Sequence, residues 1–252
     1  MEDQRKVLIT GAGGLIGSFI SQSLSKHYEL VLCDRVALNS DKHRCIQVDL
    51  GDLDALSEAC HGIDTVVHLA ADRRVYAEWE SVLPNNIIGT YNIFEAARQA
   101  GCRRIVYASS INTVRGYPND VQVHVSMPVR PPNLYGASKV WGEALARLYA
   151  DQHGLSALCL RFGWVAPRDH PDLRPGNSIL DCVITLDDTS RLIHAAIEAL
   201  DSLRFGIFHG LSNNRYKHLD ISEAREILGY EPQDDAFALA EQLQQQDAQT
   251  SE

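Results

Sequence analysis

Short apolar runs alternate with helical stretches along the first 110 residues of the chain. The runs are apolar on successive residues, which is typical of strands covered on both faces of a sheet. They are KVLIT (6–10), LVLCD (30–34), CIQVD (45–49), DTVVHLA (64–70) and RIVYASS (104–110). Repetition of strand, helix and strand predicts a parallel sheet with right-handed crossovers, and hence a doubly wound α/β fold.

The predicted helices lie between these strands and continue beyond them. Apolar spacings of three and four predict helices over 14–27, 53–60, 81–101, 136–153, 187–200, 222–228 and 236–245. Further strands are expected over 156–162 and near 206–209, and the Pro- and Gly-rich segment 163–178 is expected to be a loop. We therefore predict a core domain over 1–162, a small part over 163–245 interleaved with it, and a frayed polar tail over 246–252.

Composition argues against several classes of protein. The 252 residues are 45% hydrophobic and 22% charged, with a net charge of −10. Such acidity does not suit nucleic-acid or anionic-membrane binding, and no apolar run is long enough to span a membrane. The start MEDQRKVLIT lacks signal-peptide features and the six cysteines lack CxxC spacing, so we expect a cytoplasmic protein.

A glycine-rich turn follows the first predicted strand. In TGAGGLIG, Gly11, Gly14 and Gly17 stand between that strand and the first predicted helix. Glycines permit a tight turn, close approach of the backbone to a pyrophosphate, and close helix–strand packing, while the helix N-terminus offers N–H groups to phosphate. The motif predicts a dinucleotide site on a Rossmann-type sheet.

The ends of the next strands add to this prediction. Asp34 ends the second strand, where a carboxylate accepts hydrogen bonds from ribose hydroxyls and repels a 2′-phosphate, so NAD is favoured over NADP. Arg35 weakens this preference, because arginine can hold a 2′-phosphate. Asp49 and Leu50 end the third strand, where an adenine edge would lie.

Small residues, Ala70 and Ala71, follow the fourth predicted strand. Their size would let the backbone pass close to a ligand, although ordinary turn chemistry explains them equally well.

A tyrosine and a lysine stand one helical turn apart at the start of the helix over 136–153. Tyr135 and Lys139 in LYGASK occupy positions i and i+4 and so share a helix face. A phenol has a reference pKa of about 10, which a nearby ammonium, a helix N-terminus and a nicotinamide cation would lower. Such a phenol can take a proton from an alcohol while hydride leaves the carbon.

A serine at the end of the fifth strand would hold the substrate oxygen. Ser110 in YASSINT is the candidate and Ser109 is the alternative. A bare tyrosine–lysine pair also occurs on surface helices, but the order of glycine turn, strand-end acid, strand-end serine and pair favours a catalytic triad.

Five segments of the chain resemble the extended short-chain dehydrogenase/reductase superfamily, in its NAD-dependent epimerase/dehydratase group. They are TGAGGLIG, HLAA, NNIIGTYNIFEAAR, VYASS and YGASK. Within that group, ARQAGCRRIVYASSINTVRGYP, RPPNLYGASKVWGEALARLYADQHG and ITLDDTSRLIHAAIEA are similar to uronate dehydrogenases and related NAD-dependent sugar dehydrogenases. The resemblance implies oxidation of a sugar or sugar acid, a hexuronate or an aldose, at C1 to a lactone. It also implies a homodimer formed through helices 83–100 and 136–153.

The resemblance assigns residues as well. It implies Ser110, Tyr135 and Lys139 as the catalytic triad, NAD binding by the domain over 1–162 and substrate binding by the part over 163–245. Around NAD it implies Gly11, Gly14, Leu15, Ile16, Gly17, Asp34, Arg35, Asp49, Leu50, Leu69, Ala70 and Ala71, with Tyr135 and Lys139. It implies Asn86 as either a structural or a cofactor-binding residue.

The substrate residues are expected where the chain departs from the family pattern. The family has Asn-His after the serine, where this chain has Ile111 and Asn112, and Trp164 replaces a serine. The family arginine that binds a uronate carboxylate corresponds to Arg174 or to Arg168. The candidate substrate residues are Arg74, Ser110, Ile111, Asn112, Trp164 and Arg174, with Arg73 and Arg168 as further arginines able to bind a carboxylate or phosphate.

Other features limit the alternatives. His68 is interpreted as a core histidine, Trp164 either stacks on a sugar or caps the core, and the scattered His and Cys residues predict no metal site. About 90 residues follow the last core strand, which leaves little room for a nucleoside diphosphate. A sugar-nucleotide epimerase or reductase is therefore an alternative function, and a non-catalytic NAD(H)-binding regulatory protein is another.

Overall fold

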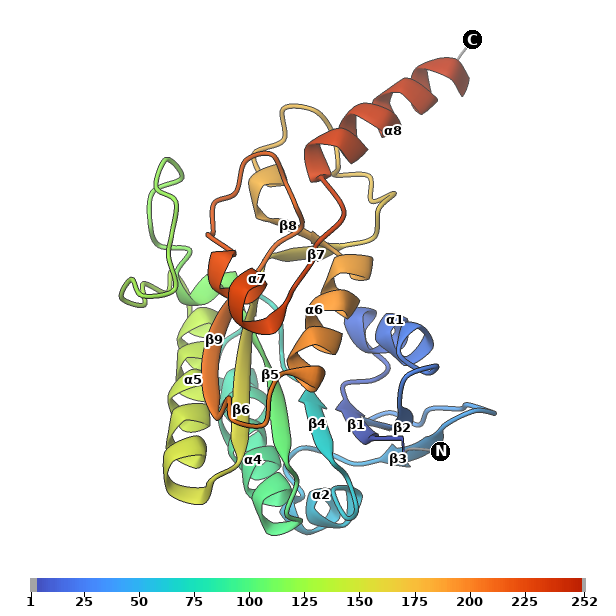
Figure 1. Ribbon diagram of the computed structural model, residues 1–252, viewed down its shortest axis with the longest axis vertical. Coiled ribbons are helices and arrows are strands. Elements are labelled where there is room, and N and C mark those ends of the chain that lie inside the picture. The colour runs from blue at the N-terminus through green and yellow to red at the C-terminus, as the bar shows by residue number, and fades with distance from the viewer. Residues whose placement is uncertain (1–3, 251–252) are drawn as a thin grey trace.

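The computed structural model describes residues 4–250 and contains one seven-stranded parallel sheet (Figure 1). The strand order is β3-β2-β1-β4-β5-β6-β9. The bounds are β1 Lys6–Thr10, β2 Glu29–Asp34, β3 Arg44–Gln47, β4 Thr65–His68, β5 Arg104–Ser110, β6 Ser156–Phe162 and β9 Phe205–Gly210. The chain builds outward from β1 to β3 and then returns to the other side of β1, so the predicted doubly wound α/β fold is confirmed.

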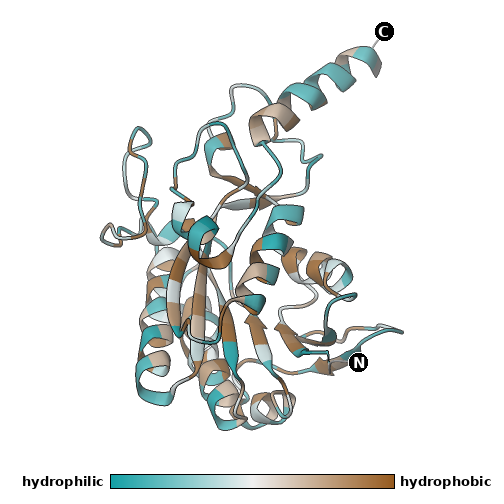
Figure 2. Cartoon of the chain, in the orientation of Figure 1, coloured by the Kyte–Doolittle hydropathy of each residue, from teal (hydrophilic) through white to brown (hydrophobic). Residues whose placement is uncertain are grey.

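Helices cover both faces of this sheet, because successive side chains of each strand point to opposite faces. Val7 and Ile9 of β1 pack on one side and Leu8 on the other. The first side carries α1 (Leu15–Ser23), α6 (Leu186–Glu198) and α7 (Ser222–Leu228), and the second carries α2 (Leu53–Ala59), α4 (Gly89–Gln99) and α5 (Leu134–His153). Figure 2 shows the strands as largely hydrophobic. Within residues 4–250, no helix combines the length and apolar character needed to cross a bilayer.

The long helix predicted over 81–101 is not a single regular α-helix. It consists of α3 (Trp79–Val82), a π-helical turn (Leu83–Ile88) and α4. Pro84 has no N–H to donate, and the Asn85 side chain occupies the Ser81 carbonyl at 2.8 Å. The backbone therefore widens here, a change that helical periodicity alone does not reveal.

The segment expected to be a loop over 163–178 begins with a strand, so that prediction was wrong for its first residues. β7 (Trp164–Ala166) pairs in parallel with β8 (Val183–Thr185), which follows a 3-10 turn (Leu180–Cys182). Three-residue strands that pair across a long loop have no periodic signature in sequence.

Several predicted helix boundaries also moved; α1, predicted over 14–27, ends at Ser23. α5 begins at Leu134, one residue after its N-cap Asn133, rather than at 136. α8 (Ala236–Thr250) continues through most of the predicted tail and extends away from the sheet (Figure 1); residues 251 and 252 lie outside the described part.

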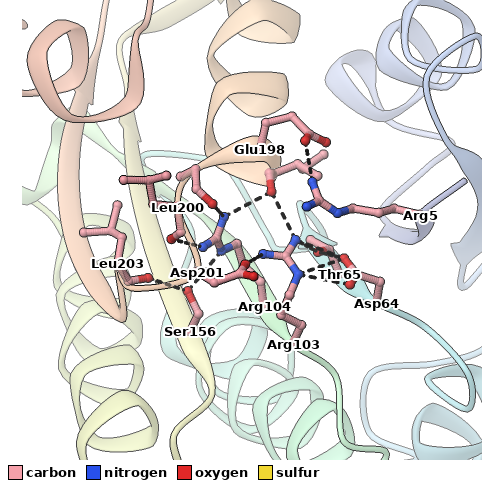
Figure 3. Close-up of polar contacts among 12 residues, drawn as sticks. Arg5, Asp64, Thr65, Arg103, Arg104, Ser156, Glu198, Leu200, Asp201 and Leu203 are labelled. Atoms are coloured by element: carbon pink, nitrogen blue, oxygen red, sulfur yellow. Dashed lines mark hydrogen bonds and ion pairs between the residues drawn. The ribbon is translucent and has the colours of Figure 1, made fainter. Parts of the chain in front are cut away.

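A buried arginine ties α6 to the sheet (Figure 3). Arg104 at the start of β5 is fully buried, and burial lowers its pKa to about 10, so it stays charged at neutral pH. Its guanidinium donates hydrogen bonds of 2.7–3.0 Å to the carbonyls that end the helix, those of Ala196, Ile197, Ala199 and Leu200. A cation here satisfies helix-end carbonyls and interacts favourably with the helix dipole.

Replacing this arginine should destabilise the fold. In Arg104→Met several buried carbonyls lose their donor, and we expect the free energy of unfolding to fall by roughly 3 kcal/mol in urea titrations. The matched control is Arg204→Met, which removes an exposed arginine that donates one bond to the Gly154 carbonyl. Equal effects of the two variants would contradict this role of Arg104.

Candidate active site

A cavity of about 1120 Å³ lies along the carboxyl ends of the strands. Open α/β sheets bind ligands in this crevice, where the strand order reverses. Its lining includes the sequence-predicted residues Gly11, Gly14, Leu15, Ile16, Gly17, Asp34, Arg35, Asp49, Leu50, Leu69, Ala70, Ala71, Arg73, Arg74, Ser109, Ser110, Ile111, Asn112, Tyr135, Lys139 and Trp164. The structure does not bring Asn86, Arg168 or Arg174 into this lining.

The turn between β1 and α1 has the shape that a dinucleotide requires. Gly11 has φ of +70°, and a Cβ there would lie 2.8 Å from the Ala70 nitrogen. At Gly17 a Cβ would lie 2.3 Å from the Gly11 carbonyl oxygen, so helix and turn are in direct contact. α1 starts at Leu15, which lines the cavity after its N-cap Gly14. These residues fit a pyrophosphate at the helix N-terminus.

Asp34 links the end of β2 to this turn. Its Oδ2 accepts a hydrogen bond from Gly13 N at 2.9 Å and its Oδ1 accepts one from Val36 N at 3.2 Å. The carboxylate thus lies in the cavity wall beside the glycine turn, where a ribose would bind in a Rossmann-type site. Arg35, which is exposed, lines the same end.

The residues that follow β3 are fixed by backbone contacts. Asp49 accepts a hydrogen bond from Gly51 N at 2.8 Å, and the Leu50 carbonyl accepts one from Asn92 Nδ2 at 2.8 Å. A Cβ on Gly89 would lie 2.8 Å from the Leu50 side chain. Leu50 is therefore pressed against α4 at the edge of the cavity.

Asn86 lies behind the cavity wall. Its Oδ1 accepts from Asp72 N at 2.8 Å, and its Nδ2 donates to the Asp72 carbonyl at 2.9 Å and to Ser138 Oγ at 3.0 Å. It thereby joins the segment after β4 to α5. This geometry agrees with the structural side of the expectation for Asn86.

The first turn of α5 lies against the turn that follows β5. Asn133 Oδ1 accepts a hydrogen bond from Gly136 N at 2.7 Å, and its Nδ2 donates to Asn112 Oδ1 at 3.0 Å. A Cβ on Gly136 would lie only 2.2 Å from the Asn112 carbonyl oxygen. This close contact sets Tyr135, in the same turn, beside the end of β5.

The two neighbouring serines of β5 have different surroundings. Ser110 Oγ accepts hydrogen bonds from Asn112 N at 3.1 Å and from Asn112 Nδ2 at 3.2 Å. Ser109 Oγ instead donates to Glu143 Oε1 at 2.6 Å, inside a buried network in which Glu143 pairs with Arg161 at 2.7 Å. The proton of Ser110 can therefore be directed toward Tyr135 and the cavity, whereas that of Ser109 is donated to Glu143.

Lys139 is a buried cation, and few contacts offset the loss of water around its charge. Its side chain is 3% exposed and, within residues 4–250, has no hydrogen-bond or ion-pair partner. The ammonium lies 5.0 Å from the Tyr107 ring centroid and 5.7 Å from that of Tyr135. Burial lowers the pKa of Lys139 to about 8.

The expected lowering of the Tyr135 pKa is not produced by the protein's own groups. Burial raises this pKa, and a hydrogen bond with Ser110 and the charge of Arg73 oppose that effect without overcoming it. Desolvation of a phenolate outweighs these favourable interactions.

His68 and Tyr107 lie beneath the lysine. His68 Nδ1 is 2.7 Å from Thr10 Oγ1, but its Nε2 has no partner within the described part of the chain, so the predicted core histidine is buried and half satisfied. Burial and the Lys139 charge lower its pKa to about 3, which keeps it neutral. Tyr107 fits under α5 because position 142 is glycine: a Cβ there would lie 2.2 Å from the Tyr107 hydroxyl oxygen. No motif marked Tyr107 or Gly142.

The arginines divide into two groups. Arg73, Arg74 and Arg115 line the cavity. Arg168 pairs with Asp234 at 2.9 Å and with Asp187 at 3.4 Å, and Arg174 pairs with Asp247 at 3.1 Å. Sequence reasoning missed Arg115, because it stands beyond the two residues after the serine that the family pattern marks.

Trp164 of β7 packs on the core and also faces the cavity, and its stacking on a sugar stays a prediction. It lines the cavity and also packs on a small apolar cluster with Leu173, Leu180 and Val183. Its ring meets His170 edge-on, with centroids 4.7 Å apart. In the part of the chain that the structure describes, no three His, Cys, Asp or Glu side chains gather in a way that could hold a metal ion.

Known proteins resemble this chain over most of its length. The sequence profile of the NAD dependent epimerase/dehydratase family matches residues 7–196. A "NAD-dependent glucose-6-phosphate dehydrogenase" of Haloferax volcanii is 35% identical over 91% of this chain and 94% of the relative. An "L-arabinose 1-dehydrogenase (NAD(P)(+))" of the same organism is 34% identical over 94% and 99%.

The structure of uronate dehydrogenase from Agrobacterium tumefaciens matches with a TM-score of 0.86 and 35% identity, covering 96% of this chain and 89% of that one. A mutant of that enzyme, complexed with NAD, matches with a TM-score of 0.85.

The buried ammonium makes a prediction about stability. Replacing it in Lys139→Met removes a charge whose burial costs roughly 3 kcal/mol, so the variant should unfold at a higher temperature than the parent while losing turnover. The difference should be largest below pH 8 and shrink as the pH rises toward 10.5, where the lysine is neutral in the unfolded chain as well. Calorimetry of both proteins across this range measures it, with exposed Lys26→Met as the control; a destabilised Lys139 variant would refute the argument.

Proposed function

The chain belongs to the NAD-dependent epimerase/dehydratase family, and we propose that it oxidises a sugar or sugar acid at C1 to the lactone. It is an NAD-dependent dehydrogenase acting on a CH–OH group, the class in which its relatives are named. The sugar specificity and the lactone product are the parts that we propose.

One observation carries the proposal: a phenol, a serine hydroxyl and a buried ammonium meet in one cavity beside a dinucleotide-shaped turn. Tyr135, Ser110 and Lys139 all line it. Keeping an unpaired ammonium inside a core is costly, and such groups cluster at catalytic sites.

The glycine turn would hold the cofactor pyrophosphate and Asp34 the adenosine ribose. When bound, NAD⁺ supplies the hydride acceptor and a positive charge beside the phenol.

The protein's own residues then handle the proton. Ser110 Oγ, which already accepts two hydrogen bonds from Asn112, donates a hydrogen bond to the oxygen on C1. Tyr135 Oη, as the phenolate, takes the hydroxyl proton and becomes the neutral phenol as the C1–H bond breaks and the carbonyl of the lactone forms. The Lys139 ammonium stabilises the phenolate that exists before this proton transfer.

Removal of the phenol hydroxyl tests the triad. We expect Tyr135→Phe to lower kcat by roughly 10²–10⁴-fold while NAD binding is nearly unchanged. Tyr149→Phe is the matched control on the same helix, because that hydroxyl donates to Glu95 at 3.0 Å, outside the cavity. The readout is NADH formation with galacturonate, glucuronate, glucose 6-phosphate, glucose, galactose, arabinose, xylose, fucose and UDP-glucose.

Three outcomes would overturn the proposal. Full activity of the Tyr135 variant would refute the assignment of the catalytic triad. Turnover of the UDP-sugar alone would favour a sugar-nucleotide enzyme. Tight NAD binding without turnover of any sugar would favour the regulatory alternative.

We also propose a homodimer through α4 and α5. Leu134, Trp141 and Leu148 stand seven residues apart on α5 and are all exposed, and Ile88 and Tyr91 are exposed beside α4. Residues at this spacing share a helix face, so the adjacent helices present an apolar surface that a second copy would cover.

The dimer is tested by sedimentation equilibrium. We expect the parent to sediment as a dimer and Trp141→Glu as a monomer, since the variant places a charge within the apolar stripe. Leu200→Glu, an exposed apolar position after α6, should remain dimeric. A monomeric parent would refute the interface.

A further inference from the structure

The substrate end of the cavity is positively charged, in a chain whose net charge is −10. Around the ends of β4 and β5, its lining contains Arg73, Arg74, Arg115 and Lys139 but only one carboxylate, Asp72. The other two acids of the lining, Asp34 and Asp49, follow β2 and β3 on the cofactor side. The cavity is thus polarised along its length, which favours an anionic group at its β4–β5 end.

Among the described residues, the lining has no carboxylate at this end that is free of other contacts. Asp72 is already engaged, since Arg74 donates to both of its oxygens and Ser81 Oγ donates to Oδ2 at 2.5 Å. A neutral sugar presents hydroxyls that need acceptors as well as donors, whereas a phosphate or carboxylate needs donors only. The arrangement therefore matches an anion better than a ring of hydroxyls.

Two guanidinium groups remain to meet such an anion. Arg73 is exposed and has no hydrogen bond or ion pair in the described part of the chain. Arg115 is half-buried and, among residues 4–250, donates only to Asn119 Oδ1, at 3.0 Å. The positive charge of Arg73 opposes the raised pKa of Tyr135, and that of Arg115 opposes the raised pKa of Cys182. The two arginines therefore act on different parts of the cavity wall.

The two candidates for the family's carboxylate-binding arginine lie elsewhere. Arg168 and Arg174 are both paired with carboxylates of the C-terminal part and lie outside the cavity lining.

We propose that Arg115, together with Arg73, forms a subsite for an anionic group, a phosphate or a carboxylate, on the part of the sugar remote from C1. This inference rests on the proposed function and names its substrate class as anionic sugars. Guanidinium binds either anion through paired N–H donors.

Matched substrate pairs test the subsite. Glucose 6-phosphate is compared with glucose, and galacturonate with galactose, at low and high salt. We expect kcat/KM to favour the anionic member of at least one pair, and salt to weaken that preference. The pair that responds identifies the anion, and preference for the neutral member of both pairs would overturn the inference.

Substitutions then assign the residues. Arg115→Met should raise KM for the anionic sugar by roughly 10–100-fold, with little change for the neutral partner or NAD, and Arg115→Lys should recover part of the loss. Exposed Arg204→Met is the matched control. Loss of the anionic preference in Arg174→Met but not in Arg115→Met would move the subsite to Arg174 and refute this assignment.

A binding measurement separates this inference from the reaction. NAD-loaded Tyr135→Phe enzyme is titrated calorimetrically with glucose 6-phosphate, galacturonate, glucose and inorganic phosphate, with and without Arg115→Met. Binding of an anion that weakens with the Arg115 substitution supports the subsite even if no sugar is turned over. Failure of every anion to bind overturns the subsite even if the enzyme oxidises neutral sugars.

Discussion

The contact between the first turn of α5 and the turn after β5 is the constraint on which the rest of the site depends. A Cβ on Gly136 would lie 2.2 Å from the Asn112 carbonyl oxygen, and Asn133 bonds to both turns. Asn112 in turn donates twice to Ser110. Small shifts of helix against strand would therefore move phenol and serine apart, which is why rigid elements rather than loops carry these groups.

The fold uses buried charge in two opposite ways. Arg104 and the pair of Glu143 with Arg161 are buried with their polar atoms satisfied, and they fasten helices to the sheet. Lys139 is buried as deeply but meets only aromatic rings. Cation–π contacts recover a small part of the desolvation cost, so the remainder has to be carried by the apolar packing of the two sheet faces.

More of the cofactor side of the site than of the substrate side could be predicted from the sequence. The strand–helix alternation and the glycine turn predicted the sheet, and Tyr135 and Lys139 could be paired from their helical spacing alone. Arg115 carried no such signal, because it stands beyond the two residues after the serine that the family pattern marks. The π-helical turn at Pro84 and the short strand at Trp164 were also missed. A local change in the hydrogen-bond pattern of a helix, or a strand of three residues, leaves no periodicity in the sequence.

The same distinction explains how one scaffold can serve different sugars. On the cofactor side, backbone contacts such as the 2.3 Å separation between a Cβ at Gly17 and the Gly11 oxygen leave no space for another residue. At the β4–β5 end, and within residues 4–250, Arg73 has no hydrogen-bond or ion-pair partner and Arg115 donates a hydrogen bond only to Asn119. Side chains so weakly coupled to the core can be exchanged at small cost in stability. Charge at this end of the cavity is therefore a property that can vary independently of the fold and of the glycine turn on the cofactor side.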